Sequence, residues 1–414
     1  MSVREIRACR LCGGADLPKL VDFGDVPLGN NLLEDAASAR AAMEYPLELH
    51  RCAACGHFQL GHAVAPEILY ATNYTYLSGI GPSFIKHFEA YAEWAVAACG
   101  LQAGALVVDV GSNDGTCLKA FKARGLAVCG VDPASLAADL ANESGIDTFK
   151  TFFDDAAVTA IKARLGPADF VTSHNVLAHV DDLAATFANV HDLLKDDGYF
   201  AFEVGYFREV LRTGCFDTIY HEHLDYHHAD PLVRHLTGLG FSVEDLSINS
   251  VQGGSIRLLL RKTGQGDVSA AAQGFLAAER DSILNDEAFL GSWRQKVETG
   301  MARFRALLRR KADAGASIAG YGAPTKATLL MKVAGIGEDD IAYVVEDNPL
   351  KTGRFLPSSA VPILPTAELM RAPPDVIVIF AWNFAADIMD KLKGKLGKSV
   401  EVVIPLPDLR TVRL

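Results

Sequence analysis

The residues best suited to chemistry lie together in one short stretch, DTIYHEHLDYHH, at positions 217–228. A histidine of near-neutral pKa can remove a proton from a carbon acid, and tyrosine can donate a hydrogen bond to the oxyanion that results. A neighbouring glutamate can fix the tautomer of such a base and stabilise its imidazolium. The same residues could instead bind a metal or form a polar loop, so the place of the stretch in the fold must decide.

Four cysteines near the N-terminus have the spacing of metal ligands. Two CxxC pairs, each followed by glycine, are formed by Cys9, Cys12, Cys52 and Cys55. Such turns aim two thiolates at one point, and two of them complete a tetrahedral, structural zinc site. The long gap between the pairs leaves open two independent buried pairs. The scattered cysteines are expected to be core residues: Cys99, Cys117, Cys129 and Cys215.

Length and charge restrict the class of protein. A chain of 414 residues should form two or three domains, and a formal net charge of −12 argues against general nucleic-acid binding. The N-terminus shows no apolar signal segment, and apolar runs such as DVIVIFAW are too short to cross a membrane. We therefore expect a cytoplasmic protein that does not associate with membranes and keeps its cysteines reduced.

Strand-like and helix-like segments alternate in the middle of the chain. The expected strands lie at 104–110, 125–133, 168–174, 198–204, 241–248 and 255–262, and the last two should form a terminal hairpin. This alternation is typical of a mainly parallel sheet that is covered by helices on both faces. Ligands of such sheets bind outside the carboxyl ends of the strands.

The turn after the first of these strands carries a binding motif. Asp109, Gly111, Asp114 and Gly115 form D-x-G-x-x-D-G, which resembles the first motif of Rossmann-like methyltransferases that use S-adenosylmethionine. In that motif the glycines let the backbone approach the amino-acid part of the donor. The dinucleotide pattern G-x-G-x-x-G is absent, which disfavours NAD at this turn. Asp114 could also cap the following helix.

Further donor contacts are expected along the same sheet edge. Asp132 ends the next strand, where an acid can bond ribose hydroxyls, and TFFDD follows near the end of a third strand, a usual place for adenine. The expected cofactor-binding residues are Asp109, Gly111, Asn113, Asp114, Asp132, Pro133, Phe153, Asp154 and Asn175. The 217–228 stretch leaves a strand at this edge too, which favours a proton-transfer site over a metal cluster.

Several separated motifs, in order, resemble one family: the zinc-containing, S-adenosylmethionine-dependent sugar C-methyltransferases of nucleotide-activated deoxysugar pathways. They are the paired CxxC, VDVGSNDGTCL, NVLAH, IYHEH, GYGAPTKAT and FAWNFA. The resemblance covers nearly the whole chain. It implies that the substrate is a nucleotide-linked 4-keto sugar, methylated through an enolate at a carbon beside the ketone, which we expect to be carbon 3.

The resemblance also assigns roles within the stretch. The expected catalytic residues are His223 as the base, with Tyr220, Glu222, His179, Tyr74 and Tyr76 around it. His221 stands where family members often carry aspartate. We place it against the substrate, although it could compete as a base or face solvent. His227 and His228 are expected at the surface or behind the site.

The last third of the chain is expected to be helical over 266–313 and then to form a second strand–turn–helix unit. Gly320 and Gly322, followed by Glu346, superficially suggest an NAD site, but Thr325 replaces the third glycine. The resemblance implies that this unit helps to hold the sugar nucleotide. The expected substrate-binding residues are His221, Gly322, Lys326, Glu346, Lys351, Arg354, Trp382 and Asn383. Each lysine alone could equally be a solvated surface charge.

Together these features predict an α/β protein with four parts. They are a zinc-binding domain at 1–75, a Rossmann-like methyltransferase domain at 76–265, a helical connector at 266–313 and a Rossmann-like sugar-nucleotide-binding domain at 314–414. Three alternatives remain open. They are a methyltransferase that acts on oxygen or on another carbon acid, a zinc-dependent binding protein with an inactive fold, and a nicotinamide oxidoreductase that uses the last unit.

Overall fold

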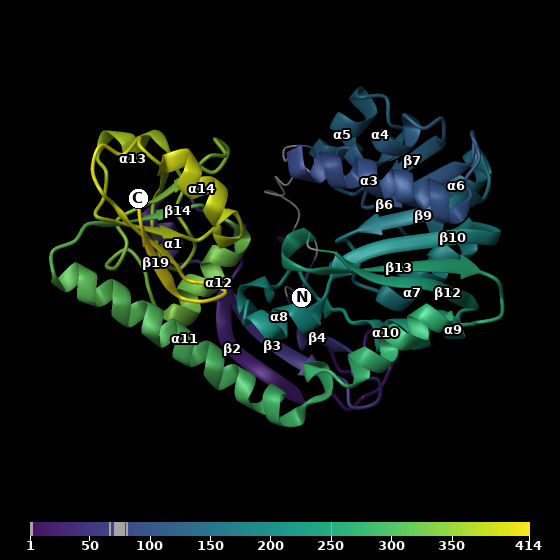
Figure 1. The fold of residues 1–414 in the computed structure, drawn as a ribbon, viewed down its shortest axis with the longest axis horizontal. Helices are drawn as coiled ribbons and strands as arrows, with labels where there is room; N and C mark the ends of the chain where they lie inside the picture. The colour runs from purple at the N-terminus through teal and green to yellow at the C-terminus, as the bar shows by residue number, and fades with distance from the viewer. Residues whose placement is uncertain (1–2, 66–67, 70–78, 80–81, 250) are drawn as a thin grey trace.

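The computed structural model describes the chain except residues 1–2, 66–67, 70–78, 80–81 and 250. A central and a C-terminal α/β unit lie side by side, and N-terminal strands lie below and between them (Figure 1). The predicted α/β class is confirmed, with a Rossmann-like sheet in the middle and a further sheet at the C-terminus. Within the described residues, no helix combines the length and the apolar character needed to cross a membrane.

The N-terminal unit is built from short antiparallel strands. Its elements are β1 (Val3–Glu5), β2 (Lys19–Pro27), α1 (Ala36–Arg40), β3 (Glu44–Arg51), β4 (Phe58–Leu60) and β5 (His62–Val64). One sheet has the order β11-β4-β3-β2, and β1 pairs with β5. Because β11 (Asp225–Tyr226) comes from the 217–228 stretch, that stretch supplies an edge strand to the N-terminal sheet.

The central unit contains a seven-stranded sheet of order β12-β13-β10-β9-β6-β7-β8. Its strands are β6 (Leu106–Val110), β7 (Ala127–Val131), β8 (Thr148–Phe149), β9 (Ala168–His174), β10 (Leu194–Gly205), β12 (Phe241–Asn249) and β13 (Ser255–Lys262). β13 runs antiparallel to both neighbours, which confirms the terminal hairpin, and the other pairs are parallel. Every residue of β6 is buried, as expected for a central parallel strand covered on both faces.

Helices pack on both faces of this sheet (Figure 1). They are α3 (Pro82–Cys99), α4 (Thr116–Lys122), α5 (Ser135–Glu143), α6 (Asp155–Leu165), α7 (Leu183–Leu193), α8 (Phe207–Thr213) and α9 (Ala229–Gly238). A one-turn 3-10 helix, η2 (Phe216–Thr218), opens the 217–228 stretch, and another, η3 (Val251–Gly253), joins the hairpin strands. The stretch therefore leaves the carboxyl end of β10, close to the turn that follows β6.

The connector is not helical throughout, so the prediction of one helix over 266–313 is wrong. It begins with α10 (Ala270–Arg280), passes through η4 (Ile283–Asn285) and continues as the long α11 (Glu287–Asp313). The break has a local cause, because Ser282 and Asp286 each accept a hydrogen bond from a backbone N–H two or three residues later and so start new turns. Met301 and Phe304 of α11 are buried packing residues.

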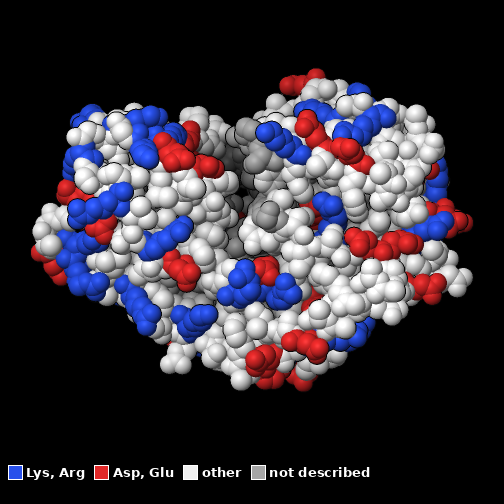
Figure 2. All heavy atoms as spheres, viewed as in Figure 1, with Lys and Arg blue, Asp and Glu red and all other residues white. Residues whose placement is uncertain are grey.

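The C-terminal unit has a six-stranded sheet of order β16-β15-β14-β17-β18-β19. Its strands are β14 (Ile318–Tyr321), β15 (Val344–Glu346), β16 (Ile363–Pro365), β17 (Val376–Ile379), β18 (Glu401–Ile404) and β19 (Arg410–Arg413). Its helices are α12 (Thr325–Ala334), α13 (Ala367–Arg371), η5 (Trp382–Phe384) and α14 (Ala385–Leu392). All strand pairs are parallel except β18 with β19. The face drawn in Figure 2 mixes both signs of charge, and a hollow separates the two α/β units on this face.

Candidate active site

The turn after β6 has a backbone that only particular residues can adopt. Gly111 has φ +73°, and a Cβ at this position would lie 2.2 Å from Cγ2 of Val176. Asn113 (φ 49°) and Asn175 (φ 57°) also lie in the left-handed region, which non-glycine residues rarely occupy. Such strained residues cluster at ligand sites. The structure thus brings three expected donor-binding residues to one edge of the sheet.

Two acids stand beneath this turn. Asp109 is buried, and its Oδ1 has no hydrogen-bond partner among the described residues. Burial raises the pKa of Asp109 well above its usual range, and the nearby Asp132 raises it further. Asp132 is bound by its surroundings, because its two oxygens accept hydrogen bonds from the backbone N–H groups of Asn113 and Ala134, both at 2.8 Å. An unpartnered carboxylate oxygen at this edge fits the ammonium group of S-adenosylmethionine.

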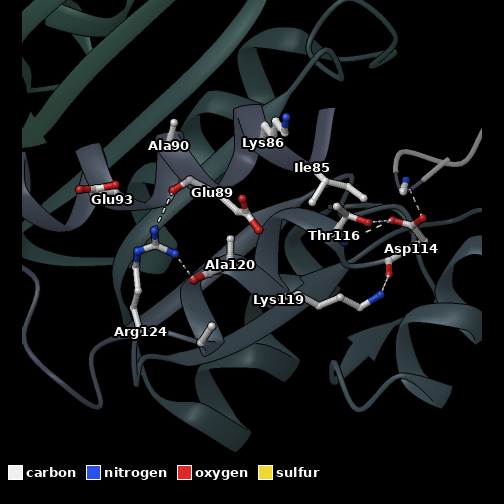
Figure 3. Close-up of a pocket in the computed structure, with 12 residues that line it drawn as sticks. Ile85, Lys86, Glu89, Ala90, Glu93, Asp114, Thr116, Lys119, Ala120 and Arg124 are labelled. Carbon is white, nitrogen blue, oxygen red and sulfur yellow. Dashed lines mark hydrogen bonds between the residues drawn. The ribbon is translucent and has the colours of Figure 1, made fainter. Parts of the chain in front are cut away.

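Asp114 stabilises the turn through its side chain. Its Oδ1 accepts hydrogen bonds from the backbone N–H and the hydroxyl of Thr116, and its Oδ2 accepts one from the Gly79 N–H (2.8 Å). Asp114 is not the N-cap of α4, because Gly115 occupies that position and no side chain caps the helix; Asp114 instead binds Thr116, the first residue of the helix. Figure 3 shows this group at one end of an open groove of about 900 Å³ between α3 and α4.

The segment after β8 divides its side chains between two environments. Phe153 is half-buried against the core, whereas Phe152 is 56% exposed. Asp154 accepts a hydrogen bond from the Ala157 N–H (2.9 Å) and so caps α6. Pro133, which follows Asp132, is exposed. The structure therefore gives Asp154 a structural task that the sequence did not suggest.

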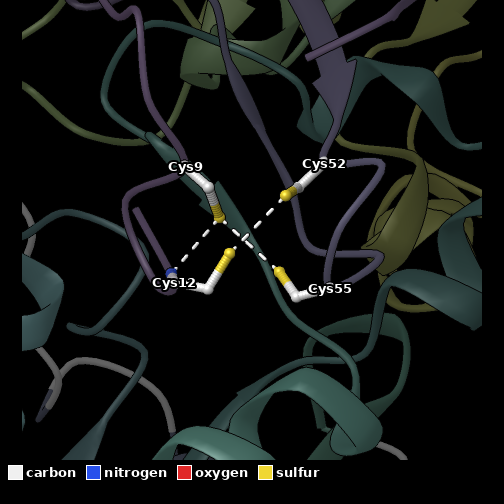
Figure 4. A group of neighbouring side chains, drawn as sticks. All are labelled: Cys9, Cys12, Cys52 and Cys55. Carbon is white, nitrogen blue, oxygen red and sulfur yellow. Dashed lines mark hydrogen bonds between the residues drawn. The ribbon is translucent and has the colours of Figure 1, made fainter. Parts of the chain in front are cut away.

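The four N-terminal cysteines converge on one point (Figure 4). Sγ of Cys9 lies 3.6 Å from Sγ of Cys55, and Sγ of Cys12 lies 3.6 Å from Sγ of Cys52. Zinc–sulfur bonds of about 2.3 Å in a tetrahedron place the sulfurs about 3.8 Å apart, which fits these distances. A hydrogen bond from the Cys55 thiol lowers the pKa of Cys9 to about 4. The set therefore fits a structural zinc ion, and two independent pairs are excluded.

The Tyr-x-Glu-His segment arranges a base in a defined tautomer. The Thr218 carbonyl, which can only accept, lies 3.0 Å from Nδ1 of His223, so Nδ1 carries the proton. Nε2 therefore presents its lone pair, and the Tyr220 hydroxyl lies 2.9 Å from it. Burial, and then the neighbouring His179, hold the pKa of His223 well below its ordinary value. The imidazole is thus a neutral base at pH 7.

His179 lies against this base, with ring centroids 4.7 Å apart. Burial lowers the pKa of His179 to about 4, although a hydrogen bond to the Glu222 backbone partly opposes the shift. The structure thus brings together three of the expected catalytic residues, His179, Tyr220 and His223. Tyr74 and Tyr76 lie outside the described residues.

Glu222 does not contact the base as expected. We predicted that it fixes the tautomer of His223, but the Thr218 carbonyl does so instead. Oε1 of Glu222 accepts a hydrogen bond from Nδ2 of Asn30 (3.1 Å), and its Oε2 is buried with no partner in the described chain. Burial raises the pKa of Glu222 to about 7. The glutamate is therefore a separate buried acid beside the loop, and it titrates near neutrality.

The other histidines of the stretch are core residues. His221 is only 1% exposed, and its Nε2 donates a hydrogen bond to the Tyr45 carbonyl (3.1 Å). The ring therefore does not face solvent, and its Nε2 is already engaged by the protein. His227 is buried as well, which excludes the surface and leaves the other expected place, behind the site. His228 spans Oε1 of Glu279 (3.2 Å) and the Gly56 carbonyl (3.0 Å). These three rings pack the stretch between the N-terminal and central units.

Three expected substrate-binding residues of the C-terminal unit meet the catalytic stretch. Nζ of Lys326 lies 3.9 Å from the Trp382 ring centroid and donates to Oδ1 of Asn383 (2.6 Å). Nε1 of Trp382 donates to Oδ2 of Asp217 (2.6 Å), which lies 4.0 Å from the Lys326 Nζ. Burial lowers the pKa of Lys326 and raises that of Asp217. Lys326 is therefore no solvated surface charge.

The remaining C-terminal candidates mostly hold their own turn together. Glu346 accepts hydrogen bonds from the backbone N–H groups of Ala323, Asp347 and Asn348 at 2.8–3.0 Å. Lys351 donates to the Ala323 carbonyl (2.9 Å), and Arg354 reaches the Leu32 carbonyl (3.4 Å). Gly322 has φ +86°, as a tight turn requires. With its carboxylate occupied in this way, Glu346 is not presented to a ribose, which removes the resemblance to an NAD site.

Some residues of the site carried no signal in the sequence. Asn30 links Glu222 to the C-terminal unit, because its Oδ1 accepts a hydrogen bond from the Thr325 hydroxyl (2.6 Å). Tyr226 lies beside His223, with ring centroids 6.4 Å apart, and its buried hydroxyl has no partner among the described residues. Asp217 was visible only as the first letter of the stretch. Their roles depend on contacts between distant segments, so spacing alone could not reveal them.

Comparison with known proteins agrees with this geometry. Three family models match successive parts of the chain: a zinc binding domain over residues 9–70, a methyltransferase domain over 84–246 and a C-methyltransferase C-terminal domain over 250–407. The donor turn and these matches define an S-adenosylmethionine-dependent methyltransferase with a structural zinc site.

A relative then places the chain more narrowly. The C-methyltransferase NovU of Streptomyces niveus is 34% identical over 411 residues, which cover 99% of this chain and 98% of the relative. The protein therefore belongs to the family of zinc-containing C-methyltransferases. Its methyl acceptor is a carbon atom.

Solved structures share part of the fold at low similarity. The chain is 18% identical to magnesium protoporphyrin IX methyltransferase from Synechocystis PCC 6803, solved with bound SAM, over 43% of this chain and 79% of that one, at a TM-score of 0.33. The same enzyme with bound SAH gives 18% identity over 43% and 83%, at a TM-score of 0.35. These scores carry no argument about function.

Proposed function

We propose that the protein methylates the carbon beside the ketone, carbon 3, of a nucleotide-linked 4-keto deoxysugar. One observation supports this most: a buried, neutral imidazole, His223, whose Nδ1 proton is held by the Thr218 carbonyl, so that Nε2 carries the lone pair of a base. Carbon acids next to a ketone need such a base at hydrogen-bond distance. The family's full-length relative is itself named a C-methyltransferase.

The proposed reaction follows from the groups around His223. Nε2 takes the proton from the carbon, the C–H electron pair forms a double bond to the carbonyl carbon, and the carbonyl π pair moves to the oxygen to give the enolate. Tyr220, which lies 2.9 Å from Nε2, is displaced by the substrate and donates its O–H to the enolate oxygen. His179 and Tyr226 flank the same imidazole and exclude water. When bound, S-adenosylmethionine would supply the electrophilic methyl group to the enolate carbon, its methyl–sulfur bond would break, and S-adenosylhomocysteine would be the leaving group.

We propose that the C-terminal unit binds the diphosphate of the nucleotide. Lys326 lies in the first turn of α12, and its ammonium lies 4.0 Å from Oδ2 of Asp217 at the start of the 217–228 stretch. A helix N-terminus with a lysine is a suitable anion site. Lys326→Ala should then raise KM for the sugar nucleotide about tenfold or more, because a charge-assisted contact is lost. Lys395→Ala, an exposed position in the same unit, is the control.

The central test is direct. The enzyme is incubated with S-adenosylmethionine and a panel of 4-keto sugar nucleotides, and the product is checked for one added methyl group by mass spectrometry. Absence of methylation across the panel would sink the proposal. Calorimetry with nucleoside diphosphates that lack the sugar distinguishes two classes of substrate. A sugar-nucleotide substrate predicts that the enzyme binds the diphosphate, whereas a non-sugar carbon acid does not.

The base is tested by solvent exchange. In deuterated water, wild-type enzyme should exchange the acidic hydrogen beside the ketone, and His223→Gln should slow that exchange by roughly 100- to 10,000-fold, the usual contribution of a general base. His191→Gln on α7 is the matched control. Retained exchange in His223→Gln would remove His223 from the role of base.

A further inference from the structure

The carboxylate of Asp225, two residues after His223, is fully buried and is held from two directions. Nε of Arg10 lies 3.0 Å from Oδ2, and Nε2 of His57 lies 2.8 Å from Oδ1. The Arg10 side chain is only 5% exposed. A buried carboxylate needs such partners, because burial of an unpaired charge is costly.

Both partners come from the metal site. Arg10 lies between Cys9 and Cys12, inside the first CxxC turn, and His57 follows the second turn by two residues. The first turn is itself tied to β4, because the Arg10 backbone N–H donates to Oε1 of the buried Gln59 (2.8 Å). Arg10 and His57 therefore extend from the two turns that carry the cysteines.

The Arg10 guanidinium contacts a second loop of the catalytic site. Its NH2 nitrogen donates to the Val180 carbonyl, directly after His179, and NH1 lies 3.8 Å from Oδ1 of Asp181. One planar, five-donor group therefore spans the segment of His179 and the segment of His223. The rings of these two histidines lie 4.7 Å apart.

The strand pairing gives the arrangement a fixed register. Asp225 of β11 lies opposite Gln59 of β4, and the Leu60 backbone N–H donates to the Leu224 carbonyl (2.9 Å). The two histidine segments also bond directly, because the Leu224 N–H donates to the Ala178 carbonyl (2.6 Å). A shift of Arg10 would therefore be transmitted to both histidines.

We propose that Arg10 is a positioning residue for the methyl-transfer site: anchored in the metal-binding turn, it sets the spacing of His179 and His223 by holding Asp225 and the Val180 carbonyl together. The inference rests on the proposed role of His223 as the base. Arginine suits the task because its rigid fork satisfies a carboxylate and a carbonyl simultaneously, which the single ammonium of lysine does not. Displacement of a base by about 1 Å can cost roughly 100-fold in rate.

The test compares Arg10→Lys and Arg10→Ala with Arg7→Ala, an exposed arginine two residues before Cys9. Arg10→Lys keeps a cation near Asp225 and guards against loss of the fold. We expect kcat to fall roughly 10-fold in Arg10→Lys and roughly 100-fold in Arg10→Ala, with KM for both substrates and zinc content unchanged. Added guanidinium should restore part of kcat to Arg10→Ala but none to His223→Gln. Arg7→Ala should match wild type.

Nuclear magnetic resonance reports the tautomer of His223 without requiring turnover. In protein labelled with ¹⁵N-histidine, the His223 signals, assigned by their loss in His223→Gln, should report a protonated Nδ1 in wild type and Arg7→Ala. In both Arg10 variants, loss of the fixed loop should give a mixture of the two tautomers. A merely structural ion pair would lower the unfolding temperature and leave these signals unchanged.

Two results would overturn the inference. One is a kcat in folded Arg10→Lys and Arg10→Ala that stays within about threefold of wild type. The other is an unchanged His223 tautomer in both variants. Failure of the proposed function looks different, because wild-type enzyme would then show neither methylation nor exchange, while the tautomer signals would still answer for Arg10.

Discussion

The turns after β6 and β14, one in each α/β unit, share a backbone geometry but differ in their surroundings. Gly111 after β6 and Gly322 after β14 both have positive φ, and each donates its N–H to the last or next-to-last residue of the neighbouring strand at 2.8 Å. The acids that end these neighbouring strands, Asp132 and Glu346, each accept a backbone N–H from the turn. The backbone plan is therefore shared, and it does not by itself make a donor site.

The difference lies two residues before each glycine. The central unit has Asp109 there, with an unpartnered buried oxygen, whereas the C-terminal unit has Gly320. A Cβ on Gly320 would lie 2.7 Å from Val344 and 2.8 Å from Phe380, so apolar side chains fill the space. The turn after β6 leaves a buried carboxyl oxygen with no partner among the described residues, whereas apolar side chains fill the space at the turn after β14. The comparison teaches that the unsatisfied group, and not the glycine pattern, marks the cofactor site.

The largest expected effect tests the unpartnered acid. Asp109→Asn should weaken S-adenosylmethionine binding by up to about 3 kcal/mol, roughly 150-fold in Kd, because a charge-assisted bond to the donor's ammonium group is lost. Isothermal titration calorimetry measures this directly. The exposed Asp139→Asn in α5 is the control. An unchanged Kd in Asp109→Asn would break the comparison between the two turns.

Glu222 carries a second buried oxygen without a partner, and its effect is on stability. Burial raises its pKa from 4.5 to about 7, so the folded protein binds this proton more tightly than the unfolded chain. Stability from this group is therefore full below pH 4.5 and is lost as pH rises to about 7. Glu222→Gln removes the charge.

The variant should therefore gain about 2 to 3 kcal/mol relative to wild type between pH 5 and pH 8. Urea unfolding at the two pH values measures the gain. Glu338→Gln should show no such dependence between pH 5 and pH 8, because Arg40 lowers the pKa of the Glu338 carboxylate and it stays charged throughout that range. An equal difference between Glu222→Gln and wild type at both pH values would show that Glu222 is not protonated in the fold.

The closed turn should respond in the opposite sense. Glu346→Gln replaces a carboxylate that accepts three backbone N–H groups, so it should lower the free energy of unfolding by about 2 kcal/mol and leave the Kd for S-adenosylmethionine unchanged. Denaturant unfolding and calorimetry on the same sample check both statements. Weaker donor binding in this variant would mean that the two turns are not independent.

The smallest effect separates two roles of Asp154. The structure shows it as the cap of α6, and loss of a capping side chain costs about 1 kcal/mol. Asp154→Ala should therefore lower stability by that amount with little change in donor affinity. Asp155→Ala, the next residue, is the control for stability. A large loss of donor affinity would instead support the adenine contact expected from the sequence.

Local patterns predicted the parts of the site that are local. The donor turn, the CxxC pairs and the Tyr-x-Glu-His segment were recognisable because their residues lie within a few positions of one another. The mainly parallel sheet was predicted from the alternation of strand-like and helix-like segments, whereas the order of its strands was not. The helical connector was overestimated, because capping by Ser282 and Asp286 interrupts a pattern that is otherwise helical.

The rest depended on contacts between distant segments. Asn30 meets Glu222, 192 positions away, and Arg10 meets Asp225, 215 positions away. His228 looks like a surface residue in the sequence, but Glu279 and the Gly56 carbonyl give it buried partners. Glu222 was expected to orient the base because it is adjacent in sequence, whereas the backbone carbonyl of Thr218 is the group in reach. Adjacency in sequence does not predict which atom of a loop meets a ring.

The N-terminal and C-terminal units contact the 217–228 stretch near its two ends. Trp382 and Lys326 meet Asp217 where the stretch begins, and Arg10 meets Asp225 toward its end. Exchange of a whole domain between family members would therefore disturb these contacts. A chimaera with the C-terminal unit of another family member would also change the residues that contact Asp217. We therefore expect a chimaera to keep these contacts only if the segments 28–33, 217–228 and 322–326 are exchanged together.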